Sequence, residues 1–126
     1  MMSKKMKAAI LYKPGDVRIE KINIPKIKLD EVLVKIKAVG ICGSDVHYFK
    51  HGRIGDYIVE KPLILGHESA GEIVEIGKEV NNWRIGERVT LEPGVPCRKC
   101  KFCKEGRYNL CTVSYTHLTL PTILRV

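Results

Sequence analysis

Residues 31–50 read EVLVKIKAVGICGSDVHYFK, and this stretch decides the fold. Its even-numbered positions from 32 to 38 are apolar, whereas Lys35 and Lys37 fall between them on the other face. This period of two is typical of a β-strand with one buried face. We therefore predict a strand over residues 31–39 that ends at Gly40.

A short helix is predicted directly after this strand, over residues 43–50. Ser44 and Asp45 are residue types that cap the N-terminus of a helix, and Gly52 is typical of a helix C-terminus. The strand and the helix together hold Cys42 between them.

The segments on either side of this unit are also predicted to be strands. Residues 7–12 and 17–22 both alternate around the turn Pro14-Gly15-Asp16, which predicts a β-hairpin. Further strands are predicted at 63–66, 72–76 and 87–91. The prediction is a mainly β domain, strongly curved and partly closed like a barrel, with one helix and long loops.

Length and composition limit the chain to one compact domain. It has 126 residues, of which 44% are hydrophobic and 29% are charged. Lys13 and Pro14 interrupt the first apolar segment, and no apolar run is long enough to span a bilayer, so we expect a cytoplasmic protein without a membrane partner. The net charge of +8 is spread along the chain, and we expect no nucleic-acid partner.

Four late cysteines give the strongest local signal. They follow the pattern C-x2-C-x2-C-x7-C, at Cys97, Cys100, Cys103 and Cys111. Paired C-x2-C turns let a chain surround a tetrahedral Zn²⁺ with four thiolates. Five basic residues lie among them and would offset the excess negative charge: Arg98, Lys99, Lys101, Lys104 and Arg107. Two disulfides, an iron–sulfur cluster and a zinc-ribbon nucleic-acid module remain alternatives.

A second group of donors comes from Cys42, His67 and Glu68. Cysteine, histidine and carboxylate together can hold zinc and leave a position open for water or an alcohol, as catalysis requires. Taken singly, each has an ordinary interpretation: a buried apolar cysteine, a hydrogen-bonded histidine and a solvated glutamate.

Several motifs occur together and in order: GICGSDVHY (40–48), GHESAG (66–71), GERV (86–89), EPG (92–94) and the four-cysteine loop. Over residues 7–111 the chain resembles zinc-containing medium-chain dehydrogenases, most of all the sorbitol/xylitol (polyol) dehydrogenases. The resemblance implies a GroES-like catalytic domain, a partly open β-barrel with a zinc lobe at residues 95–111. It makes the chain an N-terminal fragment, because G-x-G-x-x-G is absent and the family's Rossmann domain is missing.

The resemblance also implies roles for single residues. Cys42, His67 and Glu68 correspond to the ligands of the catalytic zinc, and the four late cysteines to those of a structural zinc, which makes two Zn²⁺ per chain. Ser44 and His47 look like the proton relay to solvent, and Tyr48 like a substrate contact. Asp45 would fix the tautomer of His67 through its other ring nitrogen, and would cap the helix as well.

The implied reaction is the oxidation of a polyol to a ketose with hydride transfer to NAD, and threonine or butanediol dehydrogenases are the alternatives within the family. The full-length protein is expected to be a homo-oligomer. Residues 112–126 do not resemble the family's continuation, and they indicate a truncated or artefactual reading frame, such as vector or adaptor sequence. His117 is therefore no ligand candidate, and residues 1–111, a partial catalytic domain, are predicted to be inactive alone because they hold no cofactor site.

Overall fold

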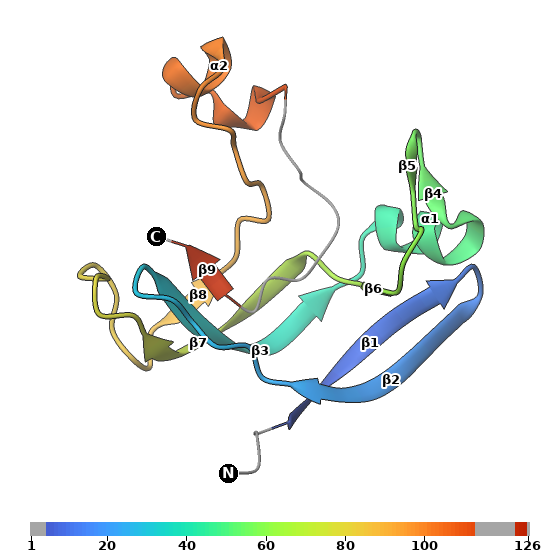
Figure 1. Cartoon of the computed structure of the whole chain (residues 1–126), viewed down its shortest axis with the longest axis horizontal. Coiled ribbons are helices and arrows are strands. Elements are labelled where there is room, and N and C mark those ends of the chain that lie inside the picture. The colour runs from blue at the N-terminus through green and yellow to red at the C-terminus, as the bar shows by residue number, and fades with distance from the viewer. Residues whose placement is uncertain (1–4, 113–122, 126) are drawn as a thin grey trace.

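The structure, a computed structural model, describes residues 5–112 and 123–125. This part of the chain consists mainly of strands, with few helices (Figure 1). In chain order its elements are β1 (Lys5–Lys13), β2 (Asp16–Asn23), β3 (Glu31–Gly40), α1 (Gly43–His51), β4 (Arg53–Ile54), β5 (Tyr57–Ile58), β6 (Leu63–Ile64), β7 (Glu68–Ile76), β8 (Arg88–Thr90), α2 (Lys101–Lys104), the 3₁₀ helix η1 (Tyr108–Leu110) and β9 (Ile123–Arg125).

Two curved sheets form the body of the domain (Figure 1). One has the order β2-β1-β6, and the other has the order β8-β7-β3-β9. All strand pairs are antiparallel, and β4 and β5 make a separate small hairpin. The predicted hairpin at the N-terminus is confirmed as β1 and β2. Its turn contains Gly15, whose N–H donates to the carbonyl of Phe49 and so ties the hairpin to α1.

The ladder between β3 and β7 is the centre of the larger sheet. Its register pairs Val32 with Ile76 at one end and Gly40 with Glu68 at the other. The strand predicted at 31–39 is confirmed, but its simple alternation is wrong. Register shifts after Leu33 and after Ile36 leave Leu33 buried, whereas Ala38 is exposed.

The main apolar cluster lies on β3, on β7 and after β8. Its buried members are Val32, Val34, Ile73 and Leu91, and the ring of Trp83 packs against them. Because Val34 and Ile73 are opposite each other in the ladder, burying this cluster also fixes the register between the two strands. The same register sets the positions of Gly40 and Glu68.

Helix α1 follows β3 as predicted, with one correction to its caps. The N-cap residue is Cys42, and the carboxylate of Asp45 accepts a hydrogen bond from the N–H of Cys42 at 3.0 Å. Gly52 ends the helix in the left-handed conformation, as predicted, and donates to the carbonyl of Tyr48. The prediction of Ser44 as a cap is wrong, because Ser44 lies inside the first turn and its Oγ has no hydrogen-bond partner among the described residues.

Other elements differ from the prediction in extent. Strand β7 starts at Glu68, four residues before the predicted strand at 72–76, because its partner β3 continues to Gly40. The hairpin of β4 and β5 and the helices α2 and η1 were not predicted, since segments this short carry no clear periodicity. None of the helices in the described ranges has the length and apolar character needed to cross a bilayer.

Most of the predicted tail lies outside the described residues. Residues 113–122 and 126, including His117, are not among them. Within the tail, residues 123–125 form β9, which pairs antiparallel with the start of β3. No structure was expected there from the sequence.

Candidate metal centres

The three predicted donors of the first centre come together at the end of the β3–β7 ladder. Cys42 follows the last residue of β3 by two positions, and Glu68 is the first residue of β7, directly opposite Gly40. His67 precedes Glu68. One ligand atom from each of Cys42, His67 and Glu68 lies within 4.8 Å of the others. Sheet register therefore brings together residues that are 25 positions apart in the sequence.

The donor set has the composition of an open zinc site. His67 is buried, Cys42 is half-buried and Glu68 is exposed, so one side of the group faces solvent. Catalytic zinc sites use three protein ligands of these types and keep the fourth position for water or substrate. The residues present therefore fit zinc as a resident cofactor.

Asp45 connects two of these donors. One oxygen of its carboxylate accepts from the N–H of Cys42, and the other lies 3.6 Å from Nδ1 of His67. Both side chains are largely buried, so their interaction is poorly screened by solvent. The distance is longer than that of a good hydrogen bond. The helix-cap role predicted for Asp45 is confirmed, and its orienting role toward His67 stays a prediction that this proximity supports.

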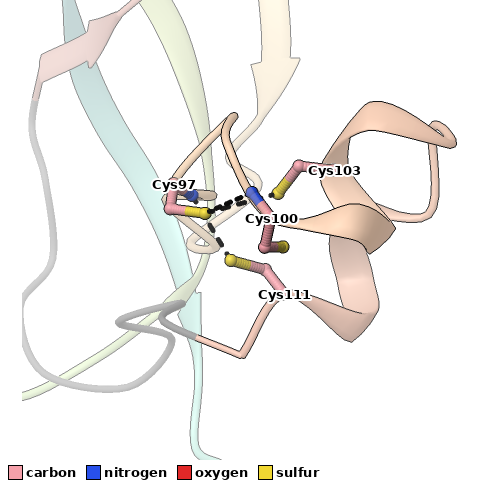
Figure 2. Close-up of side chains that lie close together, drawn as sticks. All are labelled: Cys97, Cys100, Cys103 and Cys111. Carbon is pink, nitrogen blue, oxygen red and sulfur yellow. Dashed lines mark hydrogen bonds between the residues drawn. The ribbon is translucent and has the colours of Figure 1, made fainter.

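The second centre lies in a lobe away from the sheets that contains α2 and η1 (Figure 1). Figure 2 shows the thiols of Cys97, Cys100, Cys103 and Cys111 gathered around one point, and all four Sγ atoms lie within 4.8 Å of one another. The Sγ atoms of Cys97 and Cys103 are 3.9 Å apart. Four sulfurs at about 2.3 Å from a tetrahedral zinc would lie about 3.8 Å apart. The spacing therefore fits a four-thiolate zinc site.

Backbone groups of the lobe support negative charge on the sulfurs. The N–H groups of Cys100 and Lys99 lie 3.3 and 3.5 Å from Sγ of Cys97, and the N–H of Cys97 lies 3.3 Å from Sγ of Cys111. A backbone hydrogen bond from Cys103 lowers the pKa of Cys100 to about 6, whereas desolvation raises the pKa of Cys103 to about 12. Of these two thiols, Cys100 therefore ionises more readily and is better prepared to bind a metal as a thiolate.

None of the five cysteines, all of which lie within the described residues, forms a disulfide. The 3.9 Å between Cys97 and Cys103 is almost twice the length of a disulfide bond, which is about 2.05 Å. The structure therefore contradicts the alternative of two disulfides in the lobe.

The family described as the alcohol dehydrogenase GroES-like domain matches residues 28–121. The chain belongs to this family. Sorbitol dehydrogenase of Bacillus subtilis is 58% identical to it over 106 residues, which is 84% of this chain and 30% of the relative. D-xylulose reductase of Saccharomyces cerevisiae is 52% identical over 104 residues, 82% of this chain and 29% of the relative.

Comparison with a solved structure supports the same GroES-like fold. An Escherichia coli oxidoreductase/dehydrogenase of unknown specificity superposes with a TM-score of 0.81 at 45% sequence identity, covering 94% of this chain and 35% of that one. The predicted fold class and family are thereby confirmed. The chain spans about 30% of the length of the curated relatives that it matches.

The predicted proton relay lies on one helix of the GroES-like domain. Ser44 and His47 are three residues apart on α1, a spacing that places two side chains on neighbouring positions of one helix face. Oγ of Ser44 is buried and has no hydrogen-bond partner among the described residues, whereas His47 is exposed and its ring lies 5.1 Å from that of His51. The relay stays a prediction, in which Ser44 would be the buried residue and His47 the solvent-exposed one.

Tyr48 is 1% exposed, and this burial raises the pKa of its hydroxyl. It belongs to the largest fully buried side chains of the described residues. The substrate contact predicted for Tyr48 stays a prediction that this buried position does not support.

Sequence reasoning missed a hollow beside Glu68. It has a volume of about 300 Å³ and is bordered by Ala38, Gly40, Glu68, Ser69, Ala70, Thr90 and Leu91. In the ladders Ala38 is opposite Ala70, and Ala70 is opposite Thr90, so small side chains lie side by side next to the first centre. The sequence indicates only that these residues are small, and this becomes informative once the strand pairing is known.

Proposed function

We propose that this chain carries the metal-binding part of a zinc-dependent polyol dehydrogenase, which oxidises a polyol to a ketose and transfers hydride to NAD. The observation that carries the proposal is the meeting of Cys42, His67 and Glu68, with one ligand atom of each within 4.8 Å of the others and an exposed side. The names of the relatives, a sorbitol dehydrogenase and a D-xylulose reductase, support the substrate class.

Each centre has a different role in this proposal. Zinc bound by Cys42, His67 and Glu68 supplies Lewis acidity, which lowers the pKa of a substrate hydroxyl. A second zinc bound by the four late cysteines has no free position for a substrate and stabilises the lobe. The full complement is therefore two zinc ions per chain.

The surrounding residues orient the donors and carry the proton. Asp45 faces Nδ1 of His67, which leaves Nε2 as the nitrogen that binds the metal. Ser44 takes the proton of the substrate hydroxyl on the buried side, and the exposed His47 passes it to solvent. NAD, when bound, would accept the hydride released from the carbon that bears the oxygen, which leaves the ketone.

In this proposal NAD binds to a part of the enzyme outside the described residues of this chain. We propose that residues 1–111 are a partial catalytic domain and that the 126-residue chain is inactive alone because its sequence holds no G-x-G-x-x-G. The family match continues to residue 121, so the first part of the tail at 112–126 is not foreign to the family. The full-length enzyme is proposed to be a cytoplasmic homo-oligomer that uses a small-molecule polyol and NAD.

A chimera tests the proposal. Residues of this chain would replace the matching 106-residue segment of Bacillus subtilis sorbitol dehydrogenase. We expect NAD-dependent oxidation of sorbitol or xylitol that Cys42→Ser abolishes. A folded chimera that loads zinc but oxidises neither polyol would contradict the proposal, and preferential oxidation of threonine or 2,3-butanediol would favour the alternatives within the family.

The isolated chain gives two further tests. Purified 126-residue protein is expected to show no turnover of polyols with NAD, and measurable turnover would refute its proposed inactivity. Its metal analysis separates the other classes of protein. A colourless zinc protein supports the dehydrogenase, whereas iron with visible charge-transfer absorption would indicate an iron–sulfur carrier, and steeply salt-dependent DNA binding a zinc ribbon.

A further inference from the structure

Gly40 lies directly opposite Glu68 at the end of the β3–β7 ladder. A Cβ atom added to Gly40 would stand 2.8 Å from Oε2 of Glu68 and 3.2 Å from its Cβ. The first distance is shorter than any ordinary contact between two such atoms. Gly40 does not have a positive φ, so its backbone conformation does not require glycine. The missing side chain therefore matters for the space that it leaves.

That space is filled by the carboxylate of Glu68. Residues directly opposite each other in an antiparallel ladder project to the same face, where two side chains normally share the room. Here Glu68 occupies it alone, and one of its oxygens lies within 4.8 Å of the ligand atoms of Cys42 and His67. Cys42 follows Gly40 by two residues, so the same strand end supplies both a ligand and the space for another ligand.

We propose that Gly40 is a positioning residue of the first metal centre: without a side chain, it lets the carboxylate of Glu68 fold across the ladder toward Cys42 and His67. This inference rests on the proposed function, in which these three residues bind zinc. The atom nearest to an added Cβ is the end of a flexible side chain, and the Cβ of Glu68 at 3.2 Å would have to move by only a few tenths of an ångström. A methyl group at position 40 should therefore turn the carboxylate away and leave the strands paired.

The test is metal binding by the 126-residue chain in matched variants. Zinc affinity of the first centre is measured by competition with a chromophoric chelator, after the four-cysteine centre has been filled. Cobalt substitution gives a second readout, because the bands of a site with one thiolate differ from those of a site with four. The variants are Gly40→Ala, Glu68→Ala and the double variant. Gly43→Ala is the control, because Gly43 is likewise close to Cys42 in the sequence but an added Cβ there meets nothing within 4 Å.

We expect Gly40→Ala to weaken zinc binding at the first centre by about 10- to 100-fold, the range typical of residues that position a metal ligand. Cobalt bands of this centre should change, those of the four-cysteine centre should not, and Gly43→Ala should behave as wild type. In the Glu68→Ala background, Gly40→Ala should have no further effect, because the carboxylate that it displaces is gone.

Three results would overturn the inference. The first is a Gly40→Ala variant that binds zinc as wild type does. The second is an equal loss of affinity with and without Glu68, and the third is unfolding by Gly40→Ala in both backgrounds, since either would mean that the strand needs the glycine for another reason. Absence of a second zinc from the wild-type chain would instead refute the proposed function, before any variant is compared.

Discussion

The two candidate metal centres are built in different ways. The four-cysteine centre takes all its donors from residues 97–111, and its lobe contains only the short helices α2 and η1. The centre of Cys42, His67 and Glu68 takes its donors from the ends of two long paired strands. The buried apolar cluster of the sheet supports the centre of Cys42, His67 and Glu68, whereas the lobe of the four-cysteine centre has no buried residue in either of its helices.

This difference indicates how far the structure of each centre depends on bound metal. A lobe without its own apolar core needs the metal to hold its fold, as small zinc domains do. A centre at the end of a packed ladder is positioned before metal arrives, because strand register places its ligands. We therefore expect metal to shape the lobe, and the sheet to shape the other centre.

Removing one ligand from the lobe should give the largest effect. Cys100→Ser takes away a thiol whose pKa is lowered, and zinc binding to structural sites is worth about 10–16 kcal/mol in small zinc domains. We expect backbone amides of residues 97–111 to lose protection in hydrogen exchange. The amides of β3 and β7 should keep theirs, and a loss of protection throughout the sheet would show that the two regions fold as one unit.

A cavity in the apolar cluster should weaken the centre of Cys42, His67 and Glu68 and leave the four-cysteine centre unchanged. Ile73 is fully buried on β7, and Ile73→Ala should lower the free energy of unfolding by about 2–5 kcal/mol, measured with urea. Val74→Ala on the same strand is the control, because Val74 is 39% exposed and should cost far less. Metal affinity of the first centre should fall in Ile73→Ala only. A comparable loss in the lobe would contradict the separation of the two centres.

Changing Asp45 should act on His67 without unfolding α1. Asp45→Asn keeps an oxygen that can accept from the N–H of Cys42 but removes the negative charge 3.6 Å from Nδ1 of His67. We expect zinc affinity at the first centre to fall by about 10- to 100-fold. Isothermal titration with the lobe already filled measures this change, and unchanged affinity would mean that Asp45 serves only as a helix cap.

The smallest effect is expected at the exposed pair of Arg18 and Asp16, which touches neither centre. The hydrogen bond from Arg18 lowers the pKa of Asp16, so its contribution to stability is present above the unfolded pKa and is lost as pH falls through the folded pKa. Because solvent screens exposed pairs, Arg18→Ala should hardly change the urea midpoint at neutral pH, and not at all in acid. A large change at neutral pH would show that the hairpin supports the sheet more than its exposure indicates.

Local patterns in the sequence predicted much of this structure. The spacing of Cys97, Cys100 and Cys103 indicates one metal site because the chain between them is too short to place them far apart. The alternation in residues 31–39 and the glycine at position 52 predicted β3 and the end of α1. Ser44 was misjudged as a cap because the N-cap residue is Cys42, a rare residue type at that position, two residues earlier in the chain.

Features that depend on the pairing of strands could not be predicted from local sequence patterns. The register shifts in β3, the pairing of Gly40 with Glu68 and the hollow that Ala38 and Ala70 help to line all arise from contacts between strands that are distant in the sequence. The proximity of Cys42, His67 and Glu68 was likewise anticipated only through resemblance to a family. The substrate contact of Tyr48 also comes only from the resemblance, and it stays a prediction for a side chain that is buried here.

Zinc content of the purified 126-residue chain tests the central claim most directly. With two separate centres, wild-type protein should hold two zinc ions, and Cys42→Ser and Cys100→Ser should each hold one, at different sites. Cobalt spectra would identify the remaining site in each variant. A wild-type chain with a single zinc that Cys100→Ser removes and Cys42→Ser leaves in place would contradict the account.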